Sequence, residues 1–271
     1  MTSQPKQFSH EHSSIFQDAS VVAAYPYRPP YPVELFTMLA ELLDKTNSPC
    51  CILDAGCGTG QMTQGLLPYV DSVDAVDISA AMIEAGKRMP YGSDPKIHWV
   101  AGAIESVPLQ PPYALIVAAA SLHWMPWGLT LPRFAHGLSS NGYLALVEEV
   151  HPANLWDAAL TPLIIKYSTN RDFQSYNMLT VAAELEQRGV FQQVGVKETA
   201  LVPFGQPLAH WIEAIHARNG FSRERMGTER AREFDQQVQA VMRRFFPDGE
   251  VVQQIGARIV YGKPLAPQEI G

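Results

Sequence analysis

Cys51-Ile-Leu-Asp-Ala-Gly-Cys-Gly-Thr-Gly60 is the stretch that decides the fold. Its apolar start runs into Leu53-Asp54 as a buried strand does at its end. Gly56, Gly58 and Gly60 then allow a tight turn that places no Cβ atom in the way of a ligand. Residues 61–67 are compatible with a helix, whose unpaired N–H groups and positive dipole end would face the space above the glycines. The pattern predicts a site for a mononucleotide-like group.

The charge beside this turn indicates which nucleotide cofactor fits. Dinucleotide folds carry Gly-x-Gly-x-x-Gly, with a pyrophosphate on the turn, and Gln61 stands where the third glycine would fall. The carboxylate of Asp54 would repel a pyrophosphate by about 4 kcal/mol at about 4 Å and an effective dielectric constant of about 20. The same group would attract an ammonium. S-adenosylmethionine has no phosphate and carries a sulfonium and an ammonium, so it suits the turn better than NAD, and a dehydrogenase is disfavoured.

A second acidic residue follows the glycine turn, at the end of the next predicted strand. Val73–Val76 reads as a strand that ends at Asp77, seventeen residues after Gly60. Acidic residues that bind ribose hydroxyls lie roughly 20 residues beyond such a turn. The glycine triplet alone would favour an ordinary strand-to-helix turn with a solvated aspartate. The combined pattern favours a nucleoside site.

Five stretches together resemble a known family. Leu53–Gly60 and Val76-Asp77-Ile78-Ser79 look like the first two motifs of the class I S-adenosylmethionine-dependent methyltransferases. Three further stretches are similar to the trans-aconitate methyltransferase-like branch, which acts on small molecules: Tyr27-Arg28-Pro29-Pro30-Tyr31-Pro32, Leu122-His123-Trp124 and Val260-Tyr261-Gly262-Lys263-Pro264. The resemblance implies an α/β, Rossmann-like, seven-stranded mixed sheet. Strand seven would be antiparallel, with helices on both faces and a helical cap.

The resemblance also implies a set of cofactor contacts. Arg28 and a neighbouring tyrosine would bind the methionine carboxylate, although a rigid entry into the next helix explains that segment equally well. Met82 would lie near the adenine, where a core role is the common alternative. Ala103 stands where many relatives have an aspartate, which leaves the backbone of Ile104 to read the ring. The expected cofactor-binding residues are Tyr27, Arg28, Asp54, Gly56, Gly58, Thr59, Gly60, Asp77, Ile78, Met82, Ala103, Ile104 and Ala119.

The chain divides into three expected parts. Residues 1–32 form an N-terminal arm over the cofactor, polar and mobile up to about residue 17. Residues 33–150 form the cofactor-binding core, and residues 151–271 supply strands six and seven with insertions that build a substrate cap. Cap helices are expected near residues 211–218 and 230–246. The expected strands are 51–53, 73–76, 97–100, 114–119, 143–147, 194–202 and 255–261.

Candidate catalytic and substrate-binding residues follow the fourth strand, at the edge where open α/β sheets place ligands. His123 is expected to be a general base or a group that orients the substrate, because a histidine pKa near about 6.5 suits proton transfer. Each cap residue taken singly is more often structural than functional. The expected substrate-binding residues are Trp124, Trp127, Arg171, Tyr176, Trp211, His216 and Asn219.

Composition indicates which partners and which cellular location to expect. A net charge of −7 argues against a broad basic face, so nucleic acid is not the expected partner. Cys50, Cys51 and Cys57 lack metal-ligand spacing and indicate no metal and a reducing, cytoplasmic location. The apolar run at 113–120 is far shorter than the ~18 residues of a membrane span.

The expected function is therefore methylation of a small molecule from S-adenosylmethionine. Oxygen is the favoured acceptor atom, in a carboxylate or a hydroxyl group. An N- or C-methyltransferase of a small metabolite and a non-catalytic S-adenosylmethionine-binding protein are the alternatives. The oligomeric state stays open.

Overall fold

One twisted sheet runs through the protein, as the computed structural model describes it for residues 8, 14–46, 48–172, 174 and 176–265. Its strand order is β3-β2-β1-β4-β5-β8-β6, and β7 pairs with β8 beside this path. The strands are β1 (Cys51–Ala55), β2 (Ser72–Asp77), β3 (Ile97–Ala101), β4 (Tyr113–Ala119), β5 (Leu138–Val150), β6 (Phe191–Glu198), β7 (Val202–Pro207) and β8 (Glu250–Pro264).

The first five strands are parallel, and β8 is antiparallel to β5, β6 and β7. β4 lies between β1 and β5, and its residues 113–118 are fully buried. This continuous apolar run is what a strand covered on both faces requires. Because the parallel strands share a direction, the ends of β1, β2 and β4 meet at one edge of the sheet.

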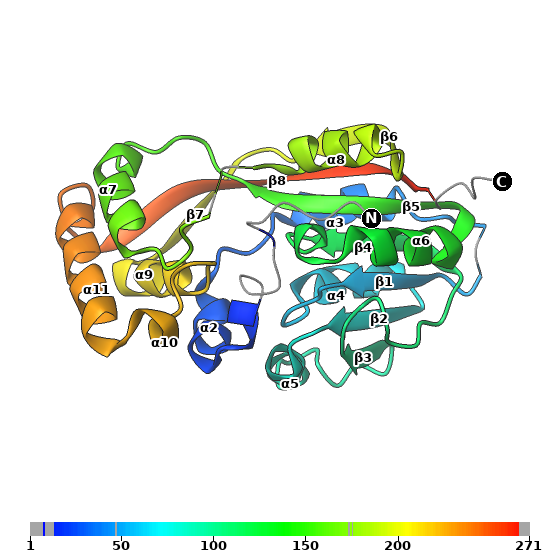
Figure 1. Cartoon of the computed structure of the whole chain (residues 1–271), viewed down its shortest axis with the longest axis horizontal. Coiled ribbons are helices and arrows are strands. Elements are labelled where there is room, and N and C mark those ends of the chain that lie inside the picture. The colour runs from blue at the N-terminus through cyan, green and yellow to red at the C-terminus, as the bar shows by residue number, and fades with distance from the viewer. Residues whose placement is uncertain (1–7, 9–13, 47, 173, 175, 266–271) are drawn as a thin grey trace.

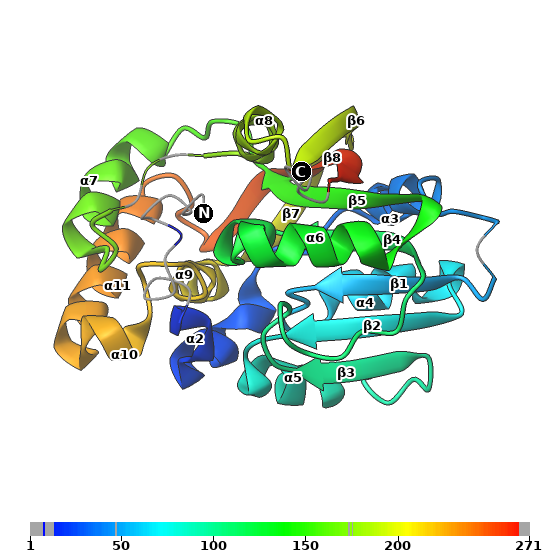
Figure 2. The same ribbon diagram turned by 45° about the vertical axis from the view of Figure 1, so that its right-hand side comes forward.

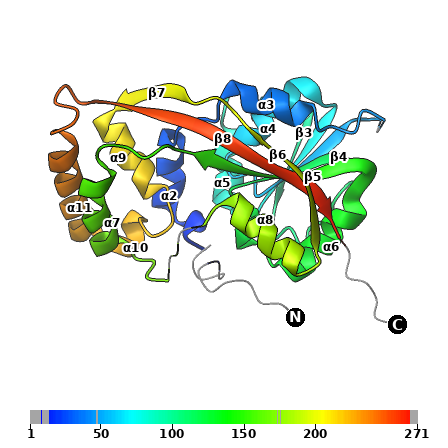
Figure 3. The same ribbon diagram turned by 90° about the horizontal axis from the view of Figure 1, so that it is seen from above.

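Helices cover both faces of the sheet (Figure 3). One face carries α3 (Val33–Ala40), α4 (Gln61–Leu66) and α5 (Ala80–Lys87), which bury Leu35, Met62 and Ile83. The other carries α6 (Trp127–Gly137) and α8 (Met178–Gln187), which bury Phe134 and Leu185. The α8 helix starts at a capping box formed by Asn177 and Thr180. Short 3-10 turns, η4 (Leu67–Tyr69) and η5 (Leu122–Trp124), follow α4 and β4.

A second, smaller group of helices lies at one end of the sheet (Figures 1 and 2). It consists of α7 (Asp157–Tyr167), α9 (Leu208–His216), α10 (Arg223–Met226) and α11 (Thr228–Met242). These helices enclose their own apolar core, with Phe234 fully buried at its centre. The fifteen-residue β8 joins the two parts, because its first residues pair with β7 and its last with β5 and β6.

The N-terminal segment lies between α5 and these cap helices (Figure 1). It forms η2 (Ser14–Gln17), α2 (Ala19–Ala24) and η3 (Tyr25–Tyr27). Ile15 is 1% exposed and packs on Met82 of α5. Asp18 accepts hydrogen bonds from the Ser222 hydroxyl at 2.6 Å and from Arg225 Nε at 2.8 Å. The expectation of a mobile start was wrong for Phe8 and residues 14–17, because apolar side chains anchor them; residues 1–7 and 9–13 lie outside the described part.

The predicted fold class is confirmed, with one strand more than expected. Sequence patterns located β1 to β4 within two residues of their bounds, whereas β5 starts five residues before the predicted strand and ends three residues after it. They placed the sixth strand at 194–202, whereas the structure has β6 at 191–198 and a separate β7. The missed β7 contains Pro203, Gly205 and Pro207, residues that are depleted in strands. No helix in the described residues is long and apolar enough to cross a membrane.

Candidate cofactor and acceptor site

The glycine turn between β1 and α4 forms the floor of the site. Gly56, Gly58 and Gly60 all have positive φ, at 74°, 55° and 87°, in the left-handed region that favours glycine. A Cβ on Gly56 would lie 2.5 Å from the Cβ of Ser121, so the end of β4 approaches the turn as closely as a bare backbone allows. The Ser121 hydroxyl donates to the carbonyl of Ala55 at 2.6 Å. The turn is therefore a fixed surface.

Asp54 is fully buried beneath this turn. Its Oδ2 accepts from the backbone N–H of Thr63 at 2.9 Å and from its hydroxyl at 2.7 Å. Its Oδ1 has no hydrogen-bond partner among the described residues. Burial raises the pKa of Asp54 to about 7, against the lowering effect of the Thr63 hydrogen bonds. The side chain therefore carries a buried acceptor oxygen that a cationic ligand group would satisfy.

Asp77 ends β2 on the opposite side of the turn. Its Oδ2 accepts from the N–H of Gly58 and its Oδ1 from the N–H of Ser79, both at 2.8 Å. Burial raises the pKa of Asp77, while these two N–H groups act in the opposite direction. Each carboxylate oxygen has a second lone pair for a ligand hydroxyl. The side chain thus fixes the turn and remains able to bind a diol.

Three side chains that sequence analysis did not select support the turn. A Cβ on Gly60 would lie 2.5 Å from Cη2 of the Trp99 ring, so this ring packs against the bare glycine. The Tyr91 hydroxyl donates to the carbonyl of Thr59 at 2.7 Å. Arg133 of α6 donates to the carbonyls of Glu105 and Val107, at 2.5 and 2.6 Å, and so holds the loop after β3. An aromatic residue beside a glycine-rich turn is only a weak signal, because packing of this kind is decided in three dimensions.

Tyr25 and Arg28 of the N-terminal segment lie above the turn. The Tyr25 ring approaches the bare backbone of Gly58, with its Cε1 3.4 Å from where a Cβ would be. The Arg28 guanidinium lies 5.3 Å from the centre of that ring and donates to Glu149 Oε1 at 2.6 Å. Burial alone would raise the pKa of Glu149, but Arg28 holds it well below its usual range. Arg28 is therefore paired with a carboxylate of β5, and Tyr25, absent from the expected residues, contacts the turn in place of Tyr27.

His123 lies in a group of aromatic rings at the end of β4. Its Nε2 accepts a hydrogen bond from the Tyr176 hydroxyl at 2.7 Å, and its ring lies 4.7 Å from that of Trp124 and 5.0 Å from that of Phe8. Burial lowers the pKa of His123 to about 3. The expectation of a general base rested on a pKa near the ordinary value. In this environment the imidazole is neutral and a weak base, and it serves as an acceptor for Tyr176.

Several other expected substrate-binding residues form contacts away from His123. His216 is fully buried between the Phe221 carbonyl and Asp235, each at 2.7 Å. Arg171 donates to the Ile165 carbonyl at 2.7 Å and caps the end of α7. The remaining three pack or bond within their own parts of the fold: Trp127 in the sheet core with Nε1 donating to Leu122, Trp211 against Gln253, and Asn219 against Asn170. Of the seven expected residues, the structure brings Trp124 and Tyr176 to His123.

The expected adenine-side residues are distributed along the same edge of the sheet. Met82 is 1% exposed in a cluster with Ile15 and Val21, so it is a core residue in this structure. Ile104 is also buried in the sheet core, whereas Ile78 is 46% exposed. Thr59, Ala103 and Ala119 are partly exposed.

These residues fit S-adenosylmethionine. The unpartnered Oδ1 of Asp54 suits its ammonium and the oxygens of Asp77 suit its ribose hydroxyls, while the Tyr25 ring lies over the bare backbone of Gly58. A pyrophosphate would meet the carboxyl groups of the buried Asp54 and the partly buried Asp77. Among the described residues no cluster of three or more His, Cys, Asp or Glu side chains could hold a metal ion.

Comparison with known proteins gives the family. Residues 52–142 match the model of a family described as a methyltransferase domain. This segment matches a methyltransferase domain. It contains the glycine turn, Asp54, Asp77 and His123, whereas Tyr25, Arg28, Glu149 and Tyr176 lie outside it.

Relatives of this methyltransferase domain are similar over part of their length. Malonyl-[acyl-carrier protein] O-methyltransferase of Halalkalibacterium halodurans is 33% identical over 118 residues, 39% of this chain and 43% of the relative. Trans-aconitate 2-methyltransferase of Pseudomonas paraeruginosa is 34% identical over 133 residues, 47% of this chain and 45% of the relative. The chain thus spans less than half the length of these relatives.

The whole fold is that of S-adenosylmethionine-dependent methyltransferases. One such enzyme from Thiobacillus denitrificans, solved in complex with S-adenosyl-L-homocysteine, has a TM-score of 0.53 and 14% identity; the similarity covers 93% of this chain and 98% of that one. The ligand in that structure, S-adenosyl-L-homocysteine, is the demethylated form of S-adenosylmethionine.

Proposed function

We propose that this chain transfers a methyl group from S-adenosylmethionine to a carboxylate oxygen of a small molecule. The observation that carries the proposal is the pair of carboxyl groups on either side of the glycine turn, the buried Asp54 and the partly buried Asp77. When bound, S-adenosylmethionine supplies a methyl group on a positively charged sulfur, which leaves as a neutral thioether when an acceptor lone pair bonds to the carbon.

The chain's own contribution to such a reaction is positioning. Asp54 would hold the ammonium and Asp77 the ribose, so the donor is fixed at two points about the turn. Tyr25 would cover the donor from above and help to exclude water. An in-line displacement gains most from this alignment, because the reacting atoms must meet in one geometry.

The state of His123 favours a carboxylate acceptor. A hydroxyl or amine acceptor must lose a proton, and an imidazole with a pKa near 3 is poorly suited to remove it at neutral pH. A carboxylate is already ionised and needs no base. Two relatives named for acidic acceptors, malonyl-[acyl-carrier protein] and trans-aconitate, support the same choice.

Charges beside the ring group are compatible with an anionic acceptor. Arg28 and Arg218 both lower the pKa of Glu149, so two cations surround one carboxylate. The three groups together carry a net charge of +1. Asp157 also acts on Arg218, and an acceptor carboxylate would be a further partner for the two guanidinium groups.

Treatment of the methylated product with alkali shows which kind of atom accepted the methyl group. The protein is incubated with S-adenosylmethionine labelled in its methyl group and with a small-molecule extract of the cells that make it. A methyl ester releases its label as volatile methanol in mild alkali, whereas an ether or a methylated amine retains it. Alkali-labile product that requires Asp77 supports the proposal. Label that stays in the product after alkali rules out a carboxylate acceptor.

A further inference from the structure

The Phe8 side chain fills a slot between three aromatic residues. Its ring centre lies 4.8 Å from that of Tyr176, 5.0 Å from that of His123 and 5.7 Å from that of Trp124. The planes of Tyr176 and Trp124 stand at 84° and 87° to the Phe8 ring, which is the edge-to-face arrangement that aromatic quadrupoles favour. Phe8 is 3% exposed, so its ring is almost completely buried.

The slot is uncharged and its walls are held in place. The Tyr176 hydroxyl donates to His123 Nε2 at 2.7 Å, which fixes the two rings at 53° to one another. Burial lowers the pKa of His123 and raises that of Tyr176, so both are neutral at physiological pH. A neutral aromatic cage favours ligands by their shape and by their polarised ring edges. It stabilises a charged group only weakly.

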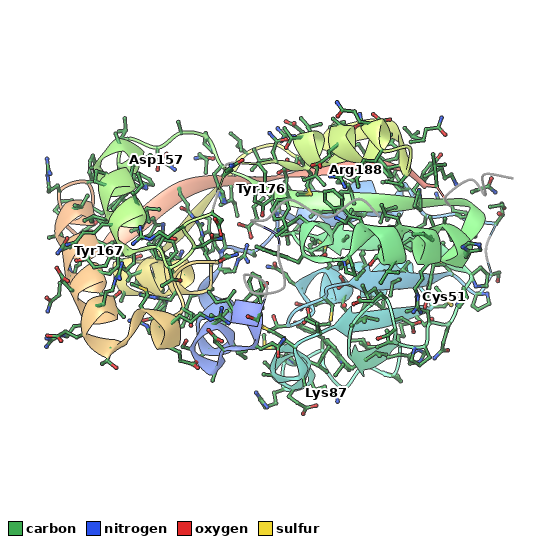
Figure 4. All side chains as sticks on the ribbon, viewed as in Figure 1. Cys51, Lys87, Asp157, Tyr167, Tyr176 and Arg188 are labelled. Carbon is green, nitrogen blue, oxygen red and sulfur yellow. The ribbon has the colours of Figure 1, made fainter. Side chains whose placement is uncertain are left out.

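The slot adjoins the glycine turn. Residues 121–125 follow β4 and contribute two of the three walls. A Cβ on Gly56 would lie 2.5 Å from Ser121 Cβ and 3.3 Å from Met125 Cε, so this segment touches the turn directly. The third wall, Tyr176, lies close enough to Arg28 and Glu149 for both to influence its pKa. Figure 4 shows Tyr176 between the sheet and the cap helices.

We propose that the slot formed by His123, Trp124 and Tyr176 is the acceptor subsite, that it takes a planar aromatic ring of the methyl acceptor, and that Phe8 occupies it until the acceptor binds. The inference rests on the proposed function, because it gives the acceptor a shape. The ring would lie among these walls with its reactive substituent toward the glycine turn. An aliphatic ring of equal size lacks the polarised edges and is thicker, so it would be rejected.

Two neutral probes, phenol and cyclohexanol, test the slot without reference to the acceptor atom. Each is titrated into the protein saturated with S-adenosylhomocysteine, and binding is followed by the indole N–H resonance of Trp124, assigned from a Trp124→Phe variant. Phenol should shift this resonance and bind at least about fivefold more tightly than cyclohexanol, as aromatic pair contacts imply. In Phe8→Ala, phenol affinity should rise by about fivefold, whereas Phe204→Ala on β7 should leave it unchanged.

The outcomes separate the two proposals. Equal affinity for the two probes in the wild-type protein, or phenol binding that leaves Trp124 unmoved, would overturn the aromatic slot, even if Phe8→Ala failed to fold. S-adenosylhomocysteine binding is measured by calorimetry in the same samples. Its absence would count against the proposed function, whereas its presence without selectivity for phenol would remove only the slot.

Discussion

Arg28 Nη2 donates to Glu149 Oε1 over 2.6 Å, and this ion pair joins the N-terminal segment to the end of β5. Both side chains are mostly buried, with exposed fractions of 20% and 17%. Arg28→Met would remove the cation that donates a hydrogen bond to the Glu149 carboxylate. We expect it to lower the free energy of unfolding by roughly 3 kcal/mol in urea titrations. The double variant Arg28→Met/Glu149→Gln should recover most of that loss. Equal instability of the single and double variants would show that the pair is not what joins these segments.

Asp54→Asn should stabilise the free protein and weaken cofactor binding. The folded-state pKa of about 7 exceeds the ordinary 3.8, so the folded protein binds a proton that the unfolded chain has released. The stabilising contribution of this group is therefore lost as pH rises from about 4 to about 7. At pH 8 the asparagine variant should unfold with a free energy higher by roughly 2 kcal/mol, and its S-adenosylmethionine affinity should fall by about tenfold or more. A variant with unchanged stability and unchanged affinity would remove Asp54 from the site.

Asp77→Ala should weaken S-adenosylmethionine binding by more than Asp77→Asn. Alanine removes the acceptors for the N–H groups of Gly58 and Ser79 together with those for the ribose. Asparagine keeps one oxygen and loses the charge. We expect about tenfold weaker binding for asparagine and about a hundredfold for alanine, by calorimetry. Wild-type dissociation constants in both variants would contradict the ribose assignment.

His123→Gln should flatten the loss of stability at acid pH. The folded-state pKa of about 3 lies below the ordinary 6.5, so the unfolded chain gains a proton first. Stability from this group is complete above about pH 6.5 and is lost as pH falls toward 3, by up to about 1.4 kcal/mol per pH unit. The glutamine variant keeps an acceptor for the Tyr176 hydroxyl and lacks this slope. Unfolding free energies at pH 4 to 7 that run parallel in the two proteins would show that His123 is not buried as a neutral ring.

Local chemistry explains why much of the fold and part of the site were predictable. The strand that ends at Asp54, the glycine turn and the strand that ends at Asp77 are set by residues adjacent in sequence, and the structure places them as predicted. The unbroken apolar run of β4 is another local signal. It fixes the position of the edge that carries His123.

Long-range packing explains what the sequence did not reveal. Nothing near Arg28 in the chain indicates that Glu149 neutralises it, or that Tyr25 rather than Tyr27 contacts Gly58. The pKa of His123 depends on burial by Phe8 and Tyr176, which lie far from it in sequence. His216 and Arg171 looked suited to a substrate, but Asp235 and the end of α7 use their polar atoms. Such partners are decided by tertiary contacts.

Calorimetric titration of the wild-type protein with S-adenosylmethionine and, separately, with NAD tests the central claim most directly. We predict that S-adenosylmethionine binds at one site per chain and that NAD binding is not detectable. In Asp77→Ala, the affinity for S-adenosylmethionine should be lower. Tight binding of NAD with no binding of S-adenosylmethionine would contradict it.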